Sequence, residues 1–396
     1  MPCAILEMRR AGVLDDVRAQ GIIPGNICWR KLDHSIVAEM KDSSQINNPD
    51  ALTVLPLGDL GKLLVKHAGN YANLEINWDH TVDQLEQDTQ GVTVRGKRSD
   101  GTAFEYTGDY CCGTDGGNSM IRKLLFGNRF DGKTWDTQII ATNASVWQLH
   151  LMIVTDFLQV YYPMETMGLG ETNFIMHPEH YFMGAKITRD GLWRVSYGEP
   201  ADMPFEEVLK RQPWKYETML PGNPKPGDYR LANINPYRIH QRCAERFRVG
   251  RVCLAADAAH LCNPFGGLGL TGGIVDVGGL SQCLIGIAEG KATDDILDKY
   301  DEVRRRVWHE IINPVSSGNF VRVSSDPDVT ADTDELIQMT MKAWHDDEVL
   351  KTQHAFAYGI CHDFSQYFNS GAEKALDLPS KGQMEATHTE MVAGEG

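Results

Sequence analysis

The sequence predicts an α/β fold in which a sheet-and-helix domain is interrupted by an antiparallel β-rich insertion and followed by a helical tail. Two segments, residues 110–122 and 252–288, each show a short apolar run, an aspartate, glycines and then a helical pattern. Such strand–turn–helix segments are typical of sheets covered by helices. Residues 135–237 lie between them and hold short β-rich runs separated by turn residues, and residues 320–368 have helical character.

The composition is that of an ordinary globular protein, with 42% hydrophobic and 23% charged residues. A chain of 396 residues has room for roughly two to three domains. The net charge of −16 argues against a nucleic-acid partner, because phosphate binding needs a basic surface. No apolar run predicts an integral membrane segment, and the N-terminal residues lack the apolar core of a signal peptide. We therefore expect a cytoplasmic protein.

The nine cysteines do not form a metal-binding pattern. They are scattered along the chain, and none belongs to a C-x-x-C pair. This spacing disfavours zinc ribbons and thioredoxin-like chemistry. The sequence therefore predicts no metal site.

Helix and strand signals alternate in the first part of the chain. Helices are predicted over residues 2–10, 13–20 and 58–68, and strands over residues 34–40, 51–55 and 74–79. The dipeptide Asp100-Gly101 lies between β-rich runs within residues 91–110, which predicts a hairpin.

Residues 110–122 predict a strand that ends before Asp115 and Gly116, followed by a helix that carries Ser119 and Arg122. An Asp-Gly pair before a helix is, by itself, an N-cap whose carboxylate accepts hydrogen bonds from the first backbone N–H groups. A ligand-binding role for these residues is the alternative interpretation.

The insertion predicts an antiparallel sheet with one covering helix. Arg189-Asp190-Gly191 supplies a turn, and Pro204 before Phe205-Glu206-Glu207 opens the helix. Strands are expected over residues 139–142, 149–155, 157–162, 172–177, 181–188 and 192–197.

The second strand–turn–helix segment carries the clearest chemical signal. The apolar run of residues 252–256 predicts a buried strand, and Asp257 follows at its end. A glycine-rich turn, residues 266–269, then opens a long apolar helix. A carboxylate at a strand end accepts hydrogen bonds from sugar-like hydroxyls, and a helix N-terminus offers unpaired N–H groups and a positive dipole end. The combination suits a ligand that bears hydroxyls and negative charge.

This segment resembles the second flavin-contacting motif of the FAD-dependent aromatic hydroxylases, of the phenol hydroxylase and para-hydroxybenzoate hydroxylase type. Asp257 matches the acidic position, and Pro264 with the following glycines matches the turn against the isoalloxazine. Ala256 replaces the usual glycine, and Thr271 stands where asparagine is common. Residues 110–122 resemble the Asp-Gly motif of the same family, at the same order and separation.

The resemblance implies a para-hydroxybenzoate hydroxylase-like FAD/NAD(P)-binding domain. It also implies an FAD-dependent monooxygenase that uses NAD(P)H and O2. Asp257 would hold the ribityl hydroxyls, Asp115 would lie nearer the phosphates, and the helix start at Gly267 to Leu270 would stabilise negative charge on reduced flavin. The implied cofactor-binding residues are Asp115, Gly116, Arg122, Asp257, Pro264, Gly266, Gly267, Gly269, Leu270 and Thr271.

The resemblance begins part-way into the family pattern. The opening strand of the family and its G-x-G-x-x-G phosphate loop would precede Met1. We therefore expect an N-terminally truncated version of the fold, or one that has lost tight flavin binding. The sequence leaves both alternatives open.

The domain boundaries implied by the resemblance interleave the two functions. Residues 1–130 and 238–315 would form the FAD-binding domain, residues 131–237 the substrate domain, residues 316–370 a helical region, and residues 371–396 a disordered tail.

Four residues in or beside the substrate domain are candidates to reach the substrate: His177, Arg194, Tyr237 and His240. The expected catalytic residues among them are Arg194, Tyr237 and His240. A phenol hydroxylase needs a group that helps to deprotonate or hydrogen-bond the substrate hydroxyl, and Tyr and His suit that role. The structural alternative is that these side chains face solvent or a carboxylate. The expected substrate is a phenolic or polyketide-like aromatic of secondary metabolism, and a homodimer is possible. Two rival functions remain: a catalytically silent paralogue acting as a scaffold, and a flavin dehydrogenase or oxidase.

Overall fold

The computed structural model describes residues 1–40, 49–145 and 162–369. The strand predicted over residues 149–155, nearly all of the one over 157–162 and the tail over 371–396 lie outside the described residues. The chain divides into two compact units. The first comprises residues 1–70, 134–239 and 318–356, and the second comprises residues 71–133, 240–317 and 357–396. This division rests on compactness, so the functional boundaries given above remain a prediction.

The first unit is built on a sheet whose strands run in the order β7-β10-β9-β8-β1-β2, with β11 on the other side of β7. β10 is antiparallel to both β7 and β9, and β9 is antiparallel to β8, as the sequence predicts for the insertion. β1 pairs parallel with β8, a pairing that the sequence does not reveal. The strands are β1 (Ile27–Arg30), β2 (Ile36–Met40), β7 (Asp131–Ser145), β8 (Thr172–Ile175), β9 (Phe182–Lys186), β10 (Trp193–Pro200) and β11 (Arg230–Cys243). Chain continuity carries β7 and β11 from one unit into the other.

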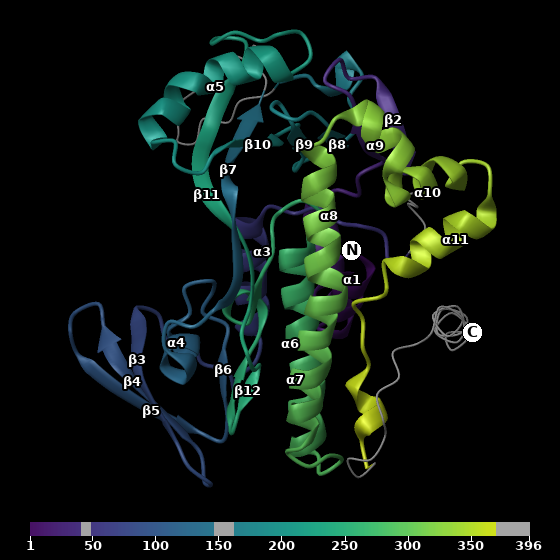
Figure 1. Cartoon of the computed structure of the whole chain (residues 1–396). Coiled ribbons are helices and arrows are strands. Elements are labelled where there is room, and N and C mark those ends of the chain that lie inside the picture. Colours follow the sequence, from purple (N-terminus) through teal and green to yellow (C-terminus); the bar gives the residue numbers. More distant parts are fainter. Residues whose placement is uncertain (41–48, 146–161, 370–396) are drawn as a thin grey trace. The chain divides into compact units, whose positions relative to one another are not determined.

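One face of this sheet is covered by α5 (Phe205–Met219), whose N-cap is Pro204 as predicted (Figure 1). Trp193, Val195 and Tyr197 of β10 belong to the same buried cluster as Tyr216 and Met219 of α5. Successive side chains of a strand point to opposite faces. Arg194 and its alternate neighbours on β10 therefore lie on the face away from α5.

The remaining helices of the first unit are short. α1 (Pro2–Arg10), α2 (Leu14–Gln20) and α3 (Leu57–Ala68) match the predicted ranges. Residues 51–55, predicted as a strand, form only an isolated bridge between Val54 and Ile22. The predicted helical region contains α8 (Asn313–Val323), α9 (Pro327–Thr333), α10 (Glu335–Ala343) and α11 (Asp347–Phe356). α10 packs on β2, and Ile337 joins Trp29, Ala38 and Met176 in a buried cluster.

The second unit holds two three-stranded sheets, ordered β12-β13-β6 and β3-β4-β5. β4 and β5 form the hairpin predicted at Asp100-Gly101. The prediction of a strand over residues 74–79 is wrong, because the segment has no ladder partner in the described part of the chain, and Leu74, Ile76 and Trp78 are exposed. The elements are β3 (His80–Gln87), β4 (Val92–Arg98), β5 (Ala103–Gly108), β6 (Cys111–Gly113), α4 (Met120–Phe126), β12 (Arg248–Val249), β13 (Val252–Leu254), β14 (His260–Leu261), α6 (Leu268–Ala288), α7 (Ile296–Val307) and the 3-10 turns η2 (Ala256–Ala258) and η4 (Phe364–Tyr367).

α6 is the long apolar helix that the sequence predicts, with the same bounds, and it lies beside α7 (Figure 1). By length and composition alone it could cross a membrane, but half of the residues in its most apolar stretch are buried inside the protein. Its glycines allow close packing. A Cβ built on Gly279 would lie 2.6 Å from the Phe364 ring, and one on Gly273 would lie 2.7 Å from the Ala256 Cβ. These contacts explain why glycine is kept in a helix despite its poor propensity.

Candidate functional site

The two segments that carry the sequence motifs lie side by side in the second unit. β13 pairs parallel with β6, so that Leu254 is opposite Gly113. The carboxyl ends of parallel strands meet at one edge of a sheet, and ligands of open α/β sheets bind beyond that edge. Asp257 and Asp115 follow these strand ends directly. The structure therefore brings together the two motifs that are separated in the sequence.

Asp115 supports the start of α4. Its Oδ1 accepts a hydrogen bond from Ser119 Oγ at 2.5 Å, and its Oδ2 accepts from the backbone N–H groups of Met120 at 2.7 Å and Ile121 at 3.1 Å. Gly116 makes the turn with φ +81°, a conformation that glycine adopts without strain. The N-cap residue itself is Ser119, whose Oγ accepts from the Arg122 N–H at 2.9 Å, so Asp115 supports the start of the helix without being its N-cap residue. A direct role of Asp115 toward a cofactor remains a prediction.

Arg122 connects the two motif loops. It is only 4% exposed, and its Nη1 donates to the carbonyl oxygen of Ala258 at 2.9 Å while its Nη2 donates to that of Gly117 at 2.8 Å. Its guanidinium also lies 3.6 Å from the centroid of the Phe130 ring. Burial lowers the pKa of the guanidinium, which nevertheless remains charged at neutral pH because its ordinary value is so high. These contacts hold the Arg122 side chain inside the protein, where it connects the two motif loops.

Asp257 has an exposed carboxylate that no hydrogen-bond donor of the described residues contacts. Desolvation by the surrounding protein raises the pKa of this carboxyl, and the neighbouring Asp276 adds to the rise while His260 opposes it. The preceding residue, Ala256, has φ +56°, in the left-handed region that favours glycine. This is the position where the resembling family has glycine. Ala256 thus adopts a conformation that suits glycine, although it carries a side chain.

The turn after Asp257 is fixed by a buried polar network. Gln241 Oε1 accepts from the Asn263 backbone N–H at 2.6 Å, and Asn263 Oδ1 accepts from the Phe265 N–H at 3.0 Å. Asn263 Nδ2 donates to the carbonyl oxygen of Ser316 at 2.8 Å. Asn263 and Phe265 are fully buried, so the chain on either side of Pro264 is held on rigid supports.

The N-terminus of α6 lacks a side-chain cap. Gly267, with φ +65°, is the N-cap residue and has no side chain to offer. The first N–H groups of the helix, including that of Gly269, therefore remain available to a ligand. Leu270 is 50% exposed in this first turn. Thr271, which stands where the family commonly has asparagine, is buried and donates to the carbonyl oxygen of Gly267 at 2.7 Å. The side chain of Thr271 is thereby turned onto its own helix, and a role toward the cofactor stays a prediction.

The candidate catalytic residues are divided between the units. Arg194 and Tyr237 belong to the first unit and His240 to the second. Desolvation raises the pKa of Tyr237 to about 12, and the positive charge of Arg194 opposes this rise. Tyr237 is 39% exposed. His177, by contrast, has a structural role, because its Nδ1 accepts from the backbone N–H groups of Glu179 and His180 at 3.0 Å and 2.9 Å.

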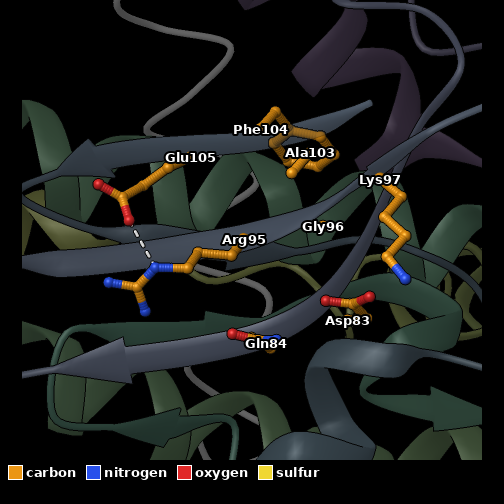
Figure 2. A pocket seen from close by; sticks show the side chains of 8 residues that line it. All are labelled: Asp83, Gln84, Arg95, Gly96, Lys97, Ala103, Phe104 and Glu105. Atoms are coloured by element: carbon orange, nitrogen blue, oxygen red, sulfur yellow. Dashed lines mark hydrogen bonds and ion pairs between the residues drawn. The ribbon is translucent and has the colours of Figure 1, made fainter. Parts of the chain in front are cut away.

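A shallow hollow of about 350 Å³ lies on the β3-β4-β5 sheet. Figure 2 shows that Arg95 and Glu105 point toward each other there, with Nε and Oε2 2.5 Å apart. The lining residues are Asp83, Gln84, Arg95, Gly96, Lys97, Ala103, Phe104 and Glu105. None of the motif residues is among them. The hollow therefore does not coincide with the site predicted from the sequence.

Comparison with known proteins gives the family. The model of the family described as "FAD binding domain" matches residues 5–314. This protein is a member of the FAD-dependent aromatic hydroxylases. The hydroxylase is 35% identical over 330 residues to a para-nitrophenol 4-monooxygenase of Pseudomonas sp. (strain WBC-3), covering 83% of this chain and 77% of the relative. It is 32% identical over 315 residues to 6-hydroxy-3-succinoylpyridine 3-monooxygenase HspB of Pseudomonas putida, covering 79% and 75%.

Solved structures agree with this membership. The p-nitrophenol 4-monooxygenase PnpA of Pseudomonas putida DLL-E4 matches the hydroxylase with a TM-score of 0.77 and 31% identity, over 88% of this chain and 87% of that one. A complex of aklavinone-11 hydroxylase with FAD and aklavinone matches with a TM-score of 0.66 and 21% identity, over 82% and 61%. This second likeness shows the shared fold. The predicted α/β fold and the predicted family are thus confirmed.

FAD is the cofactor of the hydroxylase, and the residues at the strand edge fit it. Asp257 offers a carboxylate to which none of the described residues donates a hydrogen bond, and the α6 N-terminus offers N–H groups without a side-chain cap. These are the two chemical features that ribityl hydroxyls and the electron-rich end of a flavin require.

One cluster in the hydroxylase was not predicted from the sequence. Asp276 of α6 is fully buried and binds His260 and Arg304, which are 2% and 1% exposed. Its Oδ2 lies 2.7 Å from His260 Nε2, and its Oδ1 lies 2.7 Å from Arg304 Nε. Burial alone would raise the pKa of Asp276, but the charges and hydrogen bonds of His260 and Arg304 outweigh it and lower the pKa. A single carboxylate within an apolar helix is the signal that could have revealed this cluster.

Proposed function

We propose that this hydroxylase oxidises NAD(P)H and inserts one oxygen atom of O2 into a single-ring phenolic substrate. The observation that carries the proposal is the unpartnered carboxylate of Asp257 at the same sheet edge as the uncapped start of α6. The relatives that share about a third of its sequence are named for a nitrophenol and a hydroxypyridine, each with one ring. Likeness to enzymes of larger polyketides is below 25% identity and supports the fold alone.

The protein residues at the flavin have two tasks. Asp257 accepts hydrogen bonds from ribityl hydroxyls, and the backbone N–H groups at the start of α6 stabilise negative charge on the reduced ring. When bound, FAD takes electrons from NAD(P)H and activates O2 for transfer to the substrate. Arg122 acts indirectly by connecting the two motif loops, and Asp115 acts indirectly by holding the start of α4.

We propose that Arg194 and Tyr237 bind the phenolic hydroxyl of the substrate. Tyr237 has a pKa of about 12, so it is protonated at neutral pH and donates a hydrogen bond rather than accepting a proton. The guanidinium of Arg194 favours the phenolate form of the substrate, which is the more electron-rich ring. Deprotonation of this hydroxyl is then left to solvent, and a catalytic role of His240 remains a prediction.

The test is direct. We expect the purified protein to bind FAD with a yellow flavin spectrum near one per chain, and to consume NADH or NADPH faster when a para-substituted phenol is added. With ¹⁸O2 the product should carry one labelled oxygen. A folded but colourless protein would favour the silent scaffold, and consumption of NAD(P)H without label in the product would favour the dehydrogenase or oxidase. Neither alternative is favoured by an observation on this chain. Cytoplasmic location and homodimer formation also remain proposals.

A further inference from the structure

We infer that Asp276 and Gly273 of α6 are positioning residues, which form a seat for Ala256 and thereby set the direction of the Asp257 carboxylate. The inference rests on the proposed flavin role of Asp257. It assigns a function to a buried charged cluster that the flavin motifs do not include.

The first observation is the hydrogen bonding of Asp276. Besides His260 and Arg304, its carboxylate accepts the backbone N–H of Ala256, with Oδ2 at 3.0 Å. Ala256 lies at the start of the short turn η2, and Asp257 is the next residue. A backbone group of the flavin loop is thus tied to a fully buried charge on the neighbouring helix.

The second observation is the conformation of that backbone. Ala256 has φ +56°, which is costly by about 1–2 kcal/mol for a residue with a Cβ. Such a conformation persists only where the surroundings enforce it. Because φ and ψ of Ala256 determine where the next residue points, the bond to Asp276 also determines the direction of Asp257.

The third observation is the shape of α6 beneath the loop. Gly273 lies three residues before Asp276, so both face the same side of the helix. A Cβ at position 273 would lie 2.7 Å from the Ala256 Cβ, closer than two such atoms can approach. The glycine therefore leaves room for the methyl group, while the aspartate holds the N–H group.

The charges around Asp276 keep its carboxylate ionised. A buried carboxylate needs compensating partners. Arg304 supplies a full positive charge and is itself held by the carbonyl oxygen of Ile360 at 2.8 Å. His260 supplies a further hydrogen bond and stacks on Phe247, with ring centroids 5.7 Å apart. Packing of α6 against α7 alone would require neither the bond to Ala256 nor the glycine beneath it.

The experiment is a double-mutant cycle read by FAD affinity. In Asp276→Asn, Arg304 takes the only remaining acceptor oxygen, so the amide NH2 group faces the Ala256 N–H. We expect the dissociation constant of FAD, measured by quenching of flavin fluorescence with the apo-protein, to rise about tenfold or more. Ala256→Gly alone should change it less than about threefold, because glycine adopts the left-handed conformation freely. When Ala256→Gly is already present, Asp276→Asn should raise the dissociation constant of FAD by a factor at least about threefold smaller than it does in the wild type.

The second pair of variants leaves the charges intact. Gly273→Ala should weaken FAD binding about tenfold by displacing Ala256, and Ala256→Gly in the same chain should restore most of the affinity. This pair decides the matter if Asp276→Asn does not fold. Two results would overturn the inference. One is that the fold-changes of FAD affinity in the two single variants simply multiply in the double variant, in both cycles. The other is that folded Asp276→Asn and Gly273→Ala bind FAD as tightly as the wild type. A wild-type protein that binds no FAD would instead contradict the proposed function.

Discussion

Removal of the Asp257 carboxylate should separate a ligand-binding role from a structural one. In Asp257→Ala the folded apo-protein loses no hydrogen bond, because this exposed carboxylate has no donor among the described residues. Surface substitutions of this kind change the free energy of unfolding by about 0.5 kcal/mol or less. FAD would lose hydrogen bonds to a charged acceptor, which are worth about 1.5–3 kcal/mol each. We therefore expect FAD to bind roughly 10- to 150-fold more weakly, with an almost unchanged melting temperature of the apo-protein.

The matched control is Asp115→Ala at the same edge of the sheet. Asp115 accepts three hydrogen bonds at the start of α4, from Ser119, Met120 and Ile121. Loss of such hydrogen bonds at a helix N-terminus costs about 0.5–2 kcal/mol of stability. This variant should therefore lower the melting temperature of the apo-protein. FAD titration and thermal unfolding of both variants provide the measurement. If Asp257→Ala melted several degrees lower while binding FAD as tightly as wild type, the assignment of Asp257 to the cofactor would be refuted.

A comparison of the wild type with Asp257→Asn tests the pH dependence of stability. Desolvation raises the pKa of Asp257 in the folded protein, so the folded state binds a proton more readily than the unfolded state does. Stability then falls as the pH rises through the pKa values of the two states. The apo wild type should accordingly gain stability relative to Asp257→Asn as the pH is lowered from neutral into the acid range. A difference between the two proteins that is constant with pH would contradict the raised pKa.

Three further variants test the supports of the site. Arg122→Lys should lower the free energy of unfolding by about 2–4 kcal/mol in denaturant titrations, because a single ammonium cannot replace two loop contacts and the stacking on Phe130. An unchanged free energy of unfolding would show that the contacts of Arg122 do not stabilise the fold. Asn263→Ala should destabilise by a similar amount, since it removes the hydrogen bonds of the Asn263 side chain to the Ser316 carbonyl oxygen and from the Phe265 N–H, and a loss under about 1 kcal/mol would contradict the network. Tyr237→Phe should lower kcat/KM for the phenol about tenfold without changing FAD affinity. The pH profile of kcat/KM between pH 6 and 10 should keep the same ionisations, because Tyr237 titrates at about 12. A kcat/KM equal to that of the wild type would exclude Tyr237 from the substrate site.

Local patterns in the sequence predicted the elements that depend on local physics. The helix over Leu268–Ala288, the hairpin at Asp100-Gly101 and the start of α5 after Pro204 all match the structure. Periodicity, turn residues and N-terminal proline act within a few residues, so they can be recognised without knowing the fold. Residues 74–79 show the limit of this approach. Their alternation is that of a strand, but a strand requires a partner, and the described chain provides none beside them.

Contacts between distant residues were beyond the sequence. The parallel pairing of β1 with β8 joins Ile27 to Thr172, and no pattern in either segment specifies the other. The cluster around Asp276 has the same difficulty, because His260 and Arg304 lie 16 and 28 residues away. The resemblance to a family singled out the segments of Asp115 and Asp257, which the structure places after two paired parallel strands. It could not show which of these side chains are already bonded within the protein.

The motif residues fall into two groups according to where their polar atoms point. Asp115, Arg122 and Thr271 direct their polar atoms to the protein, so each stabilises the backbone that surrounds the cofactor. Asp257 and the N-terminus of α6 direct theirs outward. Ala256 shows the consequence: it stands where the resembling family has glycine, its φ is +56°, and Asp276 and Gly273 hold it in a conformation that glycine would adopt freely. The left-handed backbone at position 256, rather than the residue type there, is therefore what we expect this edge of the sheet to need in order to hold a flavin.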